Sequence, residues 1–382
     1  LSYFASGLLN EGAGDLNALS FQKRLEDLAM RMSFEARHDM FHGSLMTLTA
    51  NAKEAFELLK LALTEPRFDA DGVERVRGQI ATVLQGELER PHAVALRAWY
   101  RHVFNGRSYG RPTKGTLESV PNISAKDLRR FTKQNFARDN LIISVVGDID
   151  AKHLGKILDD TFGVLPRKAD LSDAEVVTPV TRDTVRFVEM AIPQSVAVFG
   201  TTSIKRDDPD WYAALIVNYV LGGGGFNSRL MEELRRKRGL TYGVYSYLRP
   251  YYRTGLLMGS VSTKRDRINE SIAVIREELQ RMAEHGPTDD EVKNAKLYLT
   301  GSYALTFDRS DAIAGQLTGI QRHALGQDYV DRRNHYVDAV TAEQVRGVAK
   351  RLLVDKAFFW VVVGDTTEAT AAASEDTTPQ SK

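Results

Sequence analysis

The sequence predicts an α+β protein made of two copies of one domain, each a mostly antiparallel sheet flanked by helices. The first observation is the length of 382 residues, which exceeds what one hydrophobic core normally spans. The second is an internal repeat at a nearly constant offset. The third is the order of patterns in each copy, because alternating, strand-like stretches come first and helical stretches follow.

The repeat is clearest in two segments that align without a gap at an offset of 217 residues, 124–148 and 341–365. Each segment opens with Ser or Thr as a helix N-cap, continues in a helical pattern and ends in a buried-type strand closed by Gly-Asp. Two weaker pairs have offsets of 219 and 216 residues: 69–77 with 288–296, and 51–59 with 267–275. Three matches at nearly one offset indicate a duplication.

In the second copy the elements can be read in order. Period-two stretches in 182–203 predict strands of a sheet with one covered face. Residues 207–220 predict a helix in which Asp208 is the N-cap and Pro209 lies in the first turn. Residues 228–248 predict a helix that stops at Gly239 and is followed by a strand.

These patterns divide the chain into four parts. We predict a first domain over 1–165, a linker over 166–181, a second domain over 182–365 and a disordered tail over 366–382. At the repeat offset, Leu1 corresponds to about residue 218 of the second copy. We therefore expect the first copy to lack its opening strand pair.

Composition excludes several classes of function. The net charge is +1 and no long basic block is present, which argues against a nucleic-acid partner. There is no cysteine, so disulfides, thiol catalysis and thiolate metal sites are excluded. No apolar run approaches the length that a membrane span needs, so we predict no membrane span.

The four glycines Gly222, Gly223, Gly224 and Gly225 are the most conspicuous local feature. They follow a predicted helix and lack a Gly-Lys-Ser/Thr ending, whereas phosphate-binding loops follow a strand. The glycines can make a tight connection after the helix, or they can let an extended peptide approach the backbone closely. The residues alone leave these two interpretations open.

The stretch that contains these glycines, LGGGGFNSRLMEELRRKRGLTYGV (221–244), resembles the second-domain signature of the pitrilysin and mitochondrial processing peptidase family of zinc peptidases. Residues 109–150 resemble the first domain of that family, and the resemblance covers the chain from Leu1 to Asp365. It implies a processing-peptidase-like half clamshell of two homologous domains. Family members bind zinc through an inverted His-x-x-Glu-His motif and a later glutamate.

None of the four zinc-motif positions carries the expected residue. The two histidine positions are Tyr3 and Gly7, the general-base glutamate position is Ser6, and the family's spacing places the third ligand at Val83. Glu87 and Glu89 lie nearby and are expected to be solvated helix carboxylates. His38 and His42 have ligand-like spacing, but in paired strands such residues lie about 13 Å apart, so we interpret them as surface histidines. We expect this chain to bind no metal or other cofactor.

The resemblance also implies what such a chain can do. In paired family members the zinc-free half supplies an Arg and a Tyr that hold the substrate backbone beside the partner's zinc. Carried over by motif, these are Arg235 and Tyr242, and the four glycines join them as substrate-binding residues. We expect a non-catalytic subunit, inactive alone, that forms a heterodimer with a zinc-bearing peptidase paralogue and binds a peptide substrate.

Two other interpretations stay open. The chain can be a peptide-binding or assembly subunit of the same fold with no role in proteolysis, as core subunits of a respiratory complex share this fold. Read without the family, Arg235 compensates the dipole at a helix C-terminus and Tyr242 packs on a strand.

The periplasm is expected by analogy with bacterial pairs, and the cytoplasm is the alternative.

Overall fold

The computed structural model describes residues 1–171 and 178–365, which form two compact units. Unit 1 contains 1–87, 111–171 and 305–327, and unit 2 contains 88–110, 178–304 and 328–365. The predicted tail and the middle of the predicted linker, 172–177, lie outside the described residues. Among the helices that the structure describes, none is long and apolar enough to cross a membrane.

A five-stranded sheet forms the centre of unit 2. Its strands are β3 (Thr184–Glu189), β4 (Gln194–Ser203), β5 (Thr241–Pro250), β6 (Gly255–Lys264) and β7 (Phe359–Gly364), in the order β3-β7-β4-β6-β5. β3 pairs with β7 in parallel, and the other three pairings are antiparallel. The mostly antiparallel sheet predicted for this copy is confirmed, as are the two strands predicted over 182–203.

The helical segments of unit 2 include those that the sequence predicts over 207–220, over 228–239 and at the start of 341–365. They are α5 (Pro91–Val103), α8 (Trp211–Asn218), α9 (Ile268–His285), α10 (Asp289–Gly301), α12 (Tyr329–Ala339) and α13 (Ala342–Leu353), with the π-helical segments η5 (Tyr219–Gly223) and η7 (Met231–Lys237) and the 3-10 turns η2 (Ser108–Gly110), η6 (Gly225–Asn227) and η8 (Arg265–Arg267). The 3-10 turn η9 (Tyr303–Phe307) begins in unit 2 and ends in unit 1.

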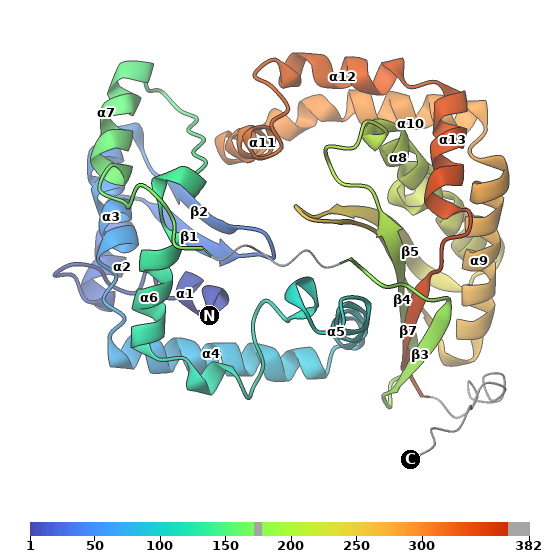
Figure 1. Cartoon of the computed structure of the whole chain (residues 1–382), viewed down its shortest axis with the longest axis horizontal. Helices are drawn as coiled ribbons and strands as arrows, with labels where there is room; N and C mark the ends of the chain where they lie inside the picture. The colour runs from blue at the N-terminus through green and yellow to red at the C-terminus, as the bar shows by residue number, and fades with distance from the viewer. Residues whose placement is uncertain (172–177, 366–382) are drawn as a thin grey trace. The chain divides into compact units, whose positions relative to one another are not determined.

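Both faces of this sheet are covered, so the prediction of a single covered face is wrong. On one face, Ala197, Phe199 and Trp360 pack with α8, α9 and α13, and Figure 1 shows these helices on one side of the sheet. On the other face, Val198 and Phe359 pack against α5. Successive side chains of a strand point alternately into the two cores, which is why β4 is buried at seven consecutive positions.

The second cover, α5, comes from the first sequence copy. α5 begins at residue 91 and α11 (Ser310–Arg322) at residue 310, an offset of 310 − 91 = 219, and each has 13 residues. The contacts of α5 place it in unit 2, whereas those of α11 place it in unit 1. The two copies have thus exchanged equivalent helices, which the sequence repeat does not reveal.

Unit 1 has a two-stranded antiparallel sheet, β1 (Arg31–Ala36) with β2 (Phe41–Met46), where the sequence predicts paired strands. It has two hydrophobic cores, one around Phe4 and Leu84 from α1 (Ser2–Ser6), α4 (Ala70–Leu88) and α6 (Ala125–Asn135), and one around Phe21 and Leu58 from α2 (Ala18–Asp27) and α3 (Ala52–Thr64). Unit 1 also contains α7 (Ala151–Phe162), α11 and the 3-10 turns η1 (Thr49–Asn51), η3 (Val120–Asn122) and η4 (Arg138–Asn140).

The strand predicted at the end of 124–148 does not form, although its counterpart β7 does. β7 lies between β3 and β4, whereas no described strand pairs with residues 141–147. Those residues bond to α11 instead, because Gln321 Nε2 donates to the Ile143 carbonyl at 3.0 Å and Thr318 Oγ1 lies 3.1 Å from Ser144 Oγ. A strand needs a ladder partner, and an apolar run alone does not supply one.

The caps that start the repeated helices are confirmed in both copies. Ser124 and Asp127 form a capping box at α6, and Thr341 and Gln344 form one at α13. The cap predicted at Asp208 is wrong, because α8 begins at Trp211. Asp208 Oδ1 accepts a hydrogen bond from the Asp210 amide at 2.9 Å, and its other carboxylate oxygen lies 2.8 Å from Arg351 Nη2.

Candidate functional site

The glycine run continues α8 through η5 into the turn η6, so the predicted helix before it is confirmed. The chain is packed closely at the first three glycines. A Cβ on Gly222 would lie 2.6 Å from the Ser246 amide nitrogen of β5, one on Gly223 would lie 2.5 Å from Asn218 Nδ2, and one on Gly224 would lie 2.8 Å from the Tyr219 carbonyl oxygen. At Gly225 the surrounding space is open, but φ is +58°, which disfavours a side chain.

We predict that Gly222→Ala lowers the free energy of unfolding by about 1–3 kcal/mol, because the new methyl group would overlap the backbone of β5. The matched control is Gly347→Ala on the exposed side of α13, where a Cβ meets nothing within 4 Å. That change should raise the free energy of unfolding by about 0.5–1 kcal/mol. Urea titration measures both, and equal effects would contradict the packing account.

Arg235 lies on η7 and is held from two sides. Its Nη1 atom donates a hydrogen bond to the Tyr242 carbonyl at 3.2 Å. Its Cζ atom lies 4.7 Å from the centroid of the Phe226 ring, within the range of a cation–π contact. The hydrogen bond takes one of the five guanidinium donors, so the group is oriented while most of its N–H groups stay available.

Arg235 differs in its charge pairing from the three basic residues that follow it. Arg236 Nη1 lies 2.6 Å from Glu232, Lys237 Nζ lies 2.6 Å from Glu233, and Arg238 also pairs with Glu233. Among the residues that the structure describes, no carboxylate lies within ion-pair distance of Arg235. Ion pairs with carboxylates of η7 therefore account for Arg236, Lys237 and Arg238 but not for Arg235.

Tyr242 occupies an irregularity at the start of β5. The register of β5 with β6 shifts between Thr241 and Gly243, so Tyr242 has no partner on β6. The hydroxyl of Thr241 fixes this bulge, donating to the Ser262 carbonyl at 2.6 Å and accepting from the Gly243 amide at 2.9 Å. A bulge re-aims a side chain, and the Tyr242 ring is 84% exposed. Strand packing, the alternative explanation for Tyr242, does not fit this exposure.

The other face of η7 is anchored by Glu233, whose side chain is only 7% exposed. Burial opposes its ionisation, but hydrogen bonds from Lys237 and Arg238 outweigh burial and lower the pKa of Glu233 to about 2. These two ion pairs are internal to η7 and its C-terminal cap, and Glu233 Oε1 also lies 3.6 Å from Arg281 Nη2 of α9, so Glu233 stabilises η7 and links it to α9 two residues before Arg235.

We predict that Glu233→Gln lowers the free energy of unfolding by about 3 kcal/mol at pH 7. The folded pKa lies below the unfolded value, so this stability is complete above about pH 5 and is lost as the pH falls through about 2. The difference from wild type should therefore shrink to about half at pH 3. Glu232→Gln, which breaks an exposed ion pair with Arg236, should cost less than about 1 kcal/mol at both pH values. An equal cost for both variants in urea titrations would contradict the prediction.

The zinc-motif positions do not form a metal site. Tyr3 and Ser6 lie on α1, Gly7 ends that helix, and Val83 lies on α4. Ser6 Oγ donates to the Tyr3 carbonyl at 2.8 Å, and Gly7 and Val83 have no side-chain donor atom, so these residues do not fit zinc. Over the described ranges, no group of three or more His, Asp or Glu side chains is arranged to hold a metal ion.

Glu87, near the expected third-ligand position, has a lysine as its ion-pair partner. Lys114 pairs with Glu87 and lies 5.9 Å from the centroid of the Tyr3 ring. The expectation that Glu87 is a solvated carboxylate is wrong, because its side chain is 17% exposed and ion-paired. Glu87 is therefore paired with a lysine from a separate segment of the chain, a partner that the spacing of residues could not reveal.

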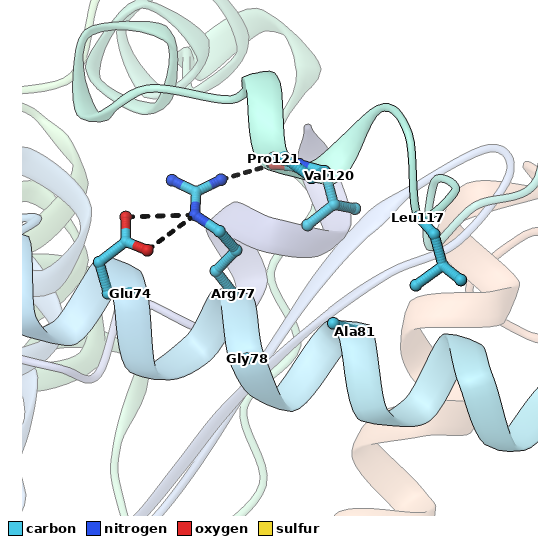
Figure 2. Close-up of a pocket in the computed structure, with 7 residues that line it drawn as sticks. All are labelled: Glu74, Arg77, Gly78, Ala81, Leu117, Val120 and Pro121. Carbon is cyan, nitrogen blue, oxygen red and sulfur yellow. Dashed lines mark hydrogen bonds and ion pairs between the residues drawn. The ribbon is translucent and has the colours of Figure 1, made fainter.

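The pocket in Figure 2 lies in unit 1 and contains none of the predicted site residues. It has a volume of about 220 Å³ and is lined by Glu74, Arg77, Gly78, Ala81, Leu117, Val120 and Pro121. Arg77 on α4 donates to the carbonyls of Val120 and Ile123 at 2.5 and 2.9 Å and pairs with Glu74. Its guanidinium therefore fastens the connection around η3 to α4, so we interpret this pocket as structural.

The fold and these residues define a class of protein: a duplicated α+β chain with a half-buried Arg beside an exposed Tyr and no metal ligands at its zinc-motif positions. Residues 122–299 match the family described as the Peptidase M16 inactive domain. This match and the relatives described below confirm the resemblance seen in the sequence, to the zinc-peptidase family of pitrilysin and mitochondrial processing peptidase and its inactive homologues.

Individual relatives agree with this assignment. The chain is 25% identical to an uncharacterized zinc protease of Streptomyces coelicolor, over 92% of this chain and 78% of that protein. It is 28% identical to the non-peptidase homolog YmxG of Helicobacter pylori, over 81% of this chain and 71% of that protein. The crystal structure of a peptidase M16 inactive domain from Pseudomonas fluorescens superimposes with a TM-score of 0.90 at 27% identity, covering 96% of this chain and 88% of that one.

Proposed function

We propose that this chain is a non-catalytic, substrate-binding subunit of a heterodimeric zinc metalloendopeptidase. In this proposal it completes the peptide chamber of a zinc-bearing paralogue and contributes Arg235 and Tyr242 to that active site. The observation that carries the proposal is the state of Arg235, a guanidinium fixed by two contacts but paired with no carboxylate among the described residues. A guanidinium that is held in place without a neighbouring carboxylate is suited to bind a ligand group that carries or develops negative charge.

The two side chains can perform one chemical task together. Nucleophilic attack on a peptide carbonyl places negative charge on its oxygen, and donors that are already oriented stabilise that charge. The Arg235 guanidinium and the Tyr242 hydroxyl are such donors, and the hydrogen bond from Arg235 to the Tyr242 backbone couples their positions. The zinc of the partner would polarise the same carbonyl and activate water.

Of the four glycines, Gly225 is the best candidate for approach by a peptide backbone. A Cβ there meets nothing within 4 Å, whereas the positions of Gly222, Gly223 and Gly224 are filled by the chain itself. We therefore propose that Gly222, Gly223 and Gly224 serve the tight connection after the helix, and that Gly225 is the glycine that a peptide backbone can approach.

A second function is a peptide-binding or assembly subunit without a role in proteolysis. It is favoured by one relative, the Helicobacter pylori protein that is named a non-peptidase homolog. Both functions use a binding surface on the same fold. They differ in whether a zinc-bearing partner gains activity from the chain.

The test is a titration of the purified chain into a fixed amount of a zinc-bearing paralogue from the same organism, followed by cleavage of a quenched fluorescent peptide library. We expect no cleavage by the chain alone and a rate that rises until the two subunits are equimolar. A paralogue that forms a complex with the chain but gains no activity would favour the assembly function. Peptide cleavage by the chain alone would contradict both.

A further inference from the structure

Phe226 is an apolar ring that is left largely exposed beside the candidate site. It lies on η6, directly after the four glycines, and is 64% exposed. The guanidinium carbon of Arg235 lies 4.7 Å from the centroid of the Phe226 ring. Because the Phe226 ring is mostly in solvent, its burial contributes little to stability. Its contact with Arg235 is the interaction that points to a role for this residue.

Two contacts decide where the Arg235 guanidinium lies. The Tyr242 carbonyl accepts one N–H at 3.2 Å, and that single hydrogen bond leaves the plane of the group free to rotate about it. The Phe226 ring supplies a flat face, on which a planar guanidinium stacks. Ion pairs fix Arg236, Lys237 and Arg238, but the described structure gives Arg235 no such pair, so the ring takes that role.

The backbone before Phe226 is built to present this ring. Gly225 has φ of +58° and the Ser228 hydroxyl donates to its carbonyl at 2.7 Å, which closes the turn η6. The Gly224 amide donates to the Tyr219 carbonyl at 2.8 Å, which fixes the start of the turn, and a Cβ on Gly224 would overlap that carbonyl. The glycine run therefore determines the position of Phe226 as well as the connection between α8 and η7.

We propose that Phe226 is a positioning residue for Arg235, and that the turn after the glycine run serves to place its ring against the guanidinium. This inference rests on the proposed function, in which Arg235 contacts the substrate, and it names the residue that orients it. Phe226 itself acts through Arg235. Loss of an exposed cation–π contact should reduce the oriented population of Arg235 about 2- to 5-fold.

The first experiment needs no partner. In the full chain labelled with ¹⁵N-arginine, the Arg235 Nε–H resonance, assigned by its loss in Arg235→Lys, should carry a ring-current shift from Phe226. We expect Phe226→Leu to remove the shift and Phe226→Tyr to retain it. The matched control is Tyr252→Leu, which removes another exposed ring, 5.3 Å from Arg253, and should leave the Arg235 resonance in place. An unchanged resonance in Phe226→Leu would overturn the inference.

The second experiment is a double-mutant cycle in the reconstituted pair. We expect Phe226→Leu to lower kcat about 2- to 5-fold with little change in KM, and Phe226→Leu to have no further effect once Arg235→Ala is present. Independent, multiplying losses would overturn the positioning role while leaving the proposed function intact. If Arg235→Ala alone has no effect, the proposed function fails, and the resonance experiment still decides whether Phe226 orients Arg235.

Discussion

Replacing Arg235 with alanine should lower the kcat of the reconstituted peptidase about 100-fold, because one preoriented donor to a developing oxyanion contributes about that much. KM should change less, since the carbonyl oxygen of the bound peptide carries little charge before attack. The loss should appear in steady-state cleavage of a peptide at saturating concentration. Tyr242→Phe removes one hydroxyl at an 84% exposed ring and should cost about 10-fold.

The matched control for Arg235→Ala is Arg236→Ala, the next residue on η7. Arg236 is an arginine of the same helix, but its guanidinium pairs with Glu232 at 2.6 Å and its side chain is 68% exposed. We expect that change to leave kcat within about 2-fold of wild type. Equal losses from both variants would mean that the site responds to net charge, and the specific role of Arg235 would then be wrong.

Trp99→Ala should lower the free energy of unfolding by about 3–5 kcal/mol. Trp99 on α5 is fully buried, and its Nε1 atom donates to the Phe359 carbonyl of β7 at 3.0 Å. Truncation would leave a large cavity between α5 and the sheet and would remove a buried hydrogen bond. Urea titration of the full chain, followed by circular dichroism, measures the change.

Two variants separate the causes of that loss. Trp99→Phe keeps an aromatic ring and removes the donor, so it should cost about 1–2 kcal/mol. Leu19→Ala on α2 removes a side chain that is 81% exposed and should cost less than about 0.5 kcal/mol. A cost below about 1 kcal/mol for Trp99→Ala would contradict the account of α5 as the cover of the sheet's second face.

Local patterns were sufficient to predict several elements of the fold. The alternation in 182–203 predicted β3 and β4, and the repeated Ser and Thr caps predicted the starts of α6 and α13. The position of α5 could not be predicted, because it depends on which sheet receives Trp99, and a helical pattern does not contain that information. The strand predicted at 141–147 is absent for the same reason, because a strand needs a hydrogen-bonding partner strand elsewhere in the chain and the local pattern does not specify one.

The candidate site could be predicted in part. The family motif identified Arg235 and Tyr242, but it did not show that Arg235 lacks a carboxylate partner among the described residues or that Tyr242 sits in a bulge. Phe226 was missed, because only the distance of 4.7 Å between its ring and the guanidinium distinguishes it from an ordinary loop residue. The Phe-Asn-Ser stretch after the glycines offers no pattern that would have identified it.

We propose that this chain contributes hydrogen-bond donors to the active site of another subunit. The most direct measurement is the kcat of the reconstituted pair that carries both Arg235→Ala and Tyr242→Phe, with zinc content and complex formation verified to match wild type. We predict a loss of about 100-fold or more, with the zinc-bearing subunit still fully loaded. An intact, zinc-loaded complex that cleaves peptide at the wild-type rate would contradict the account.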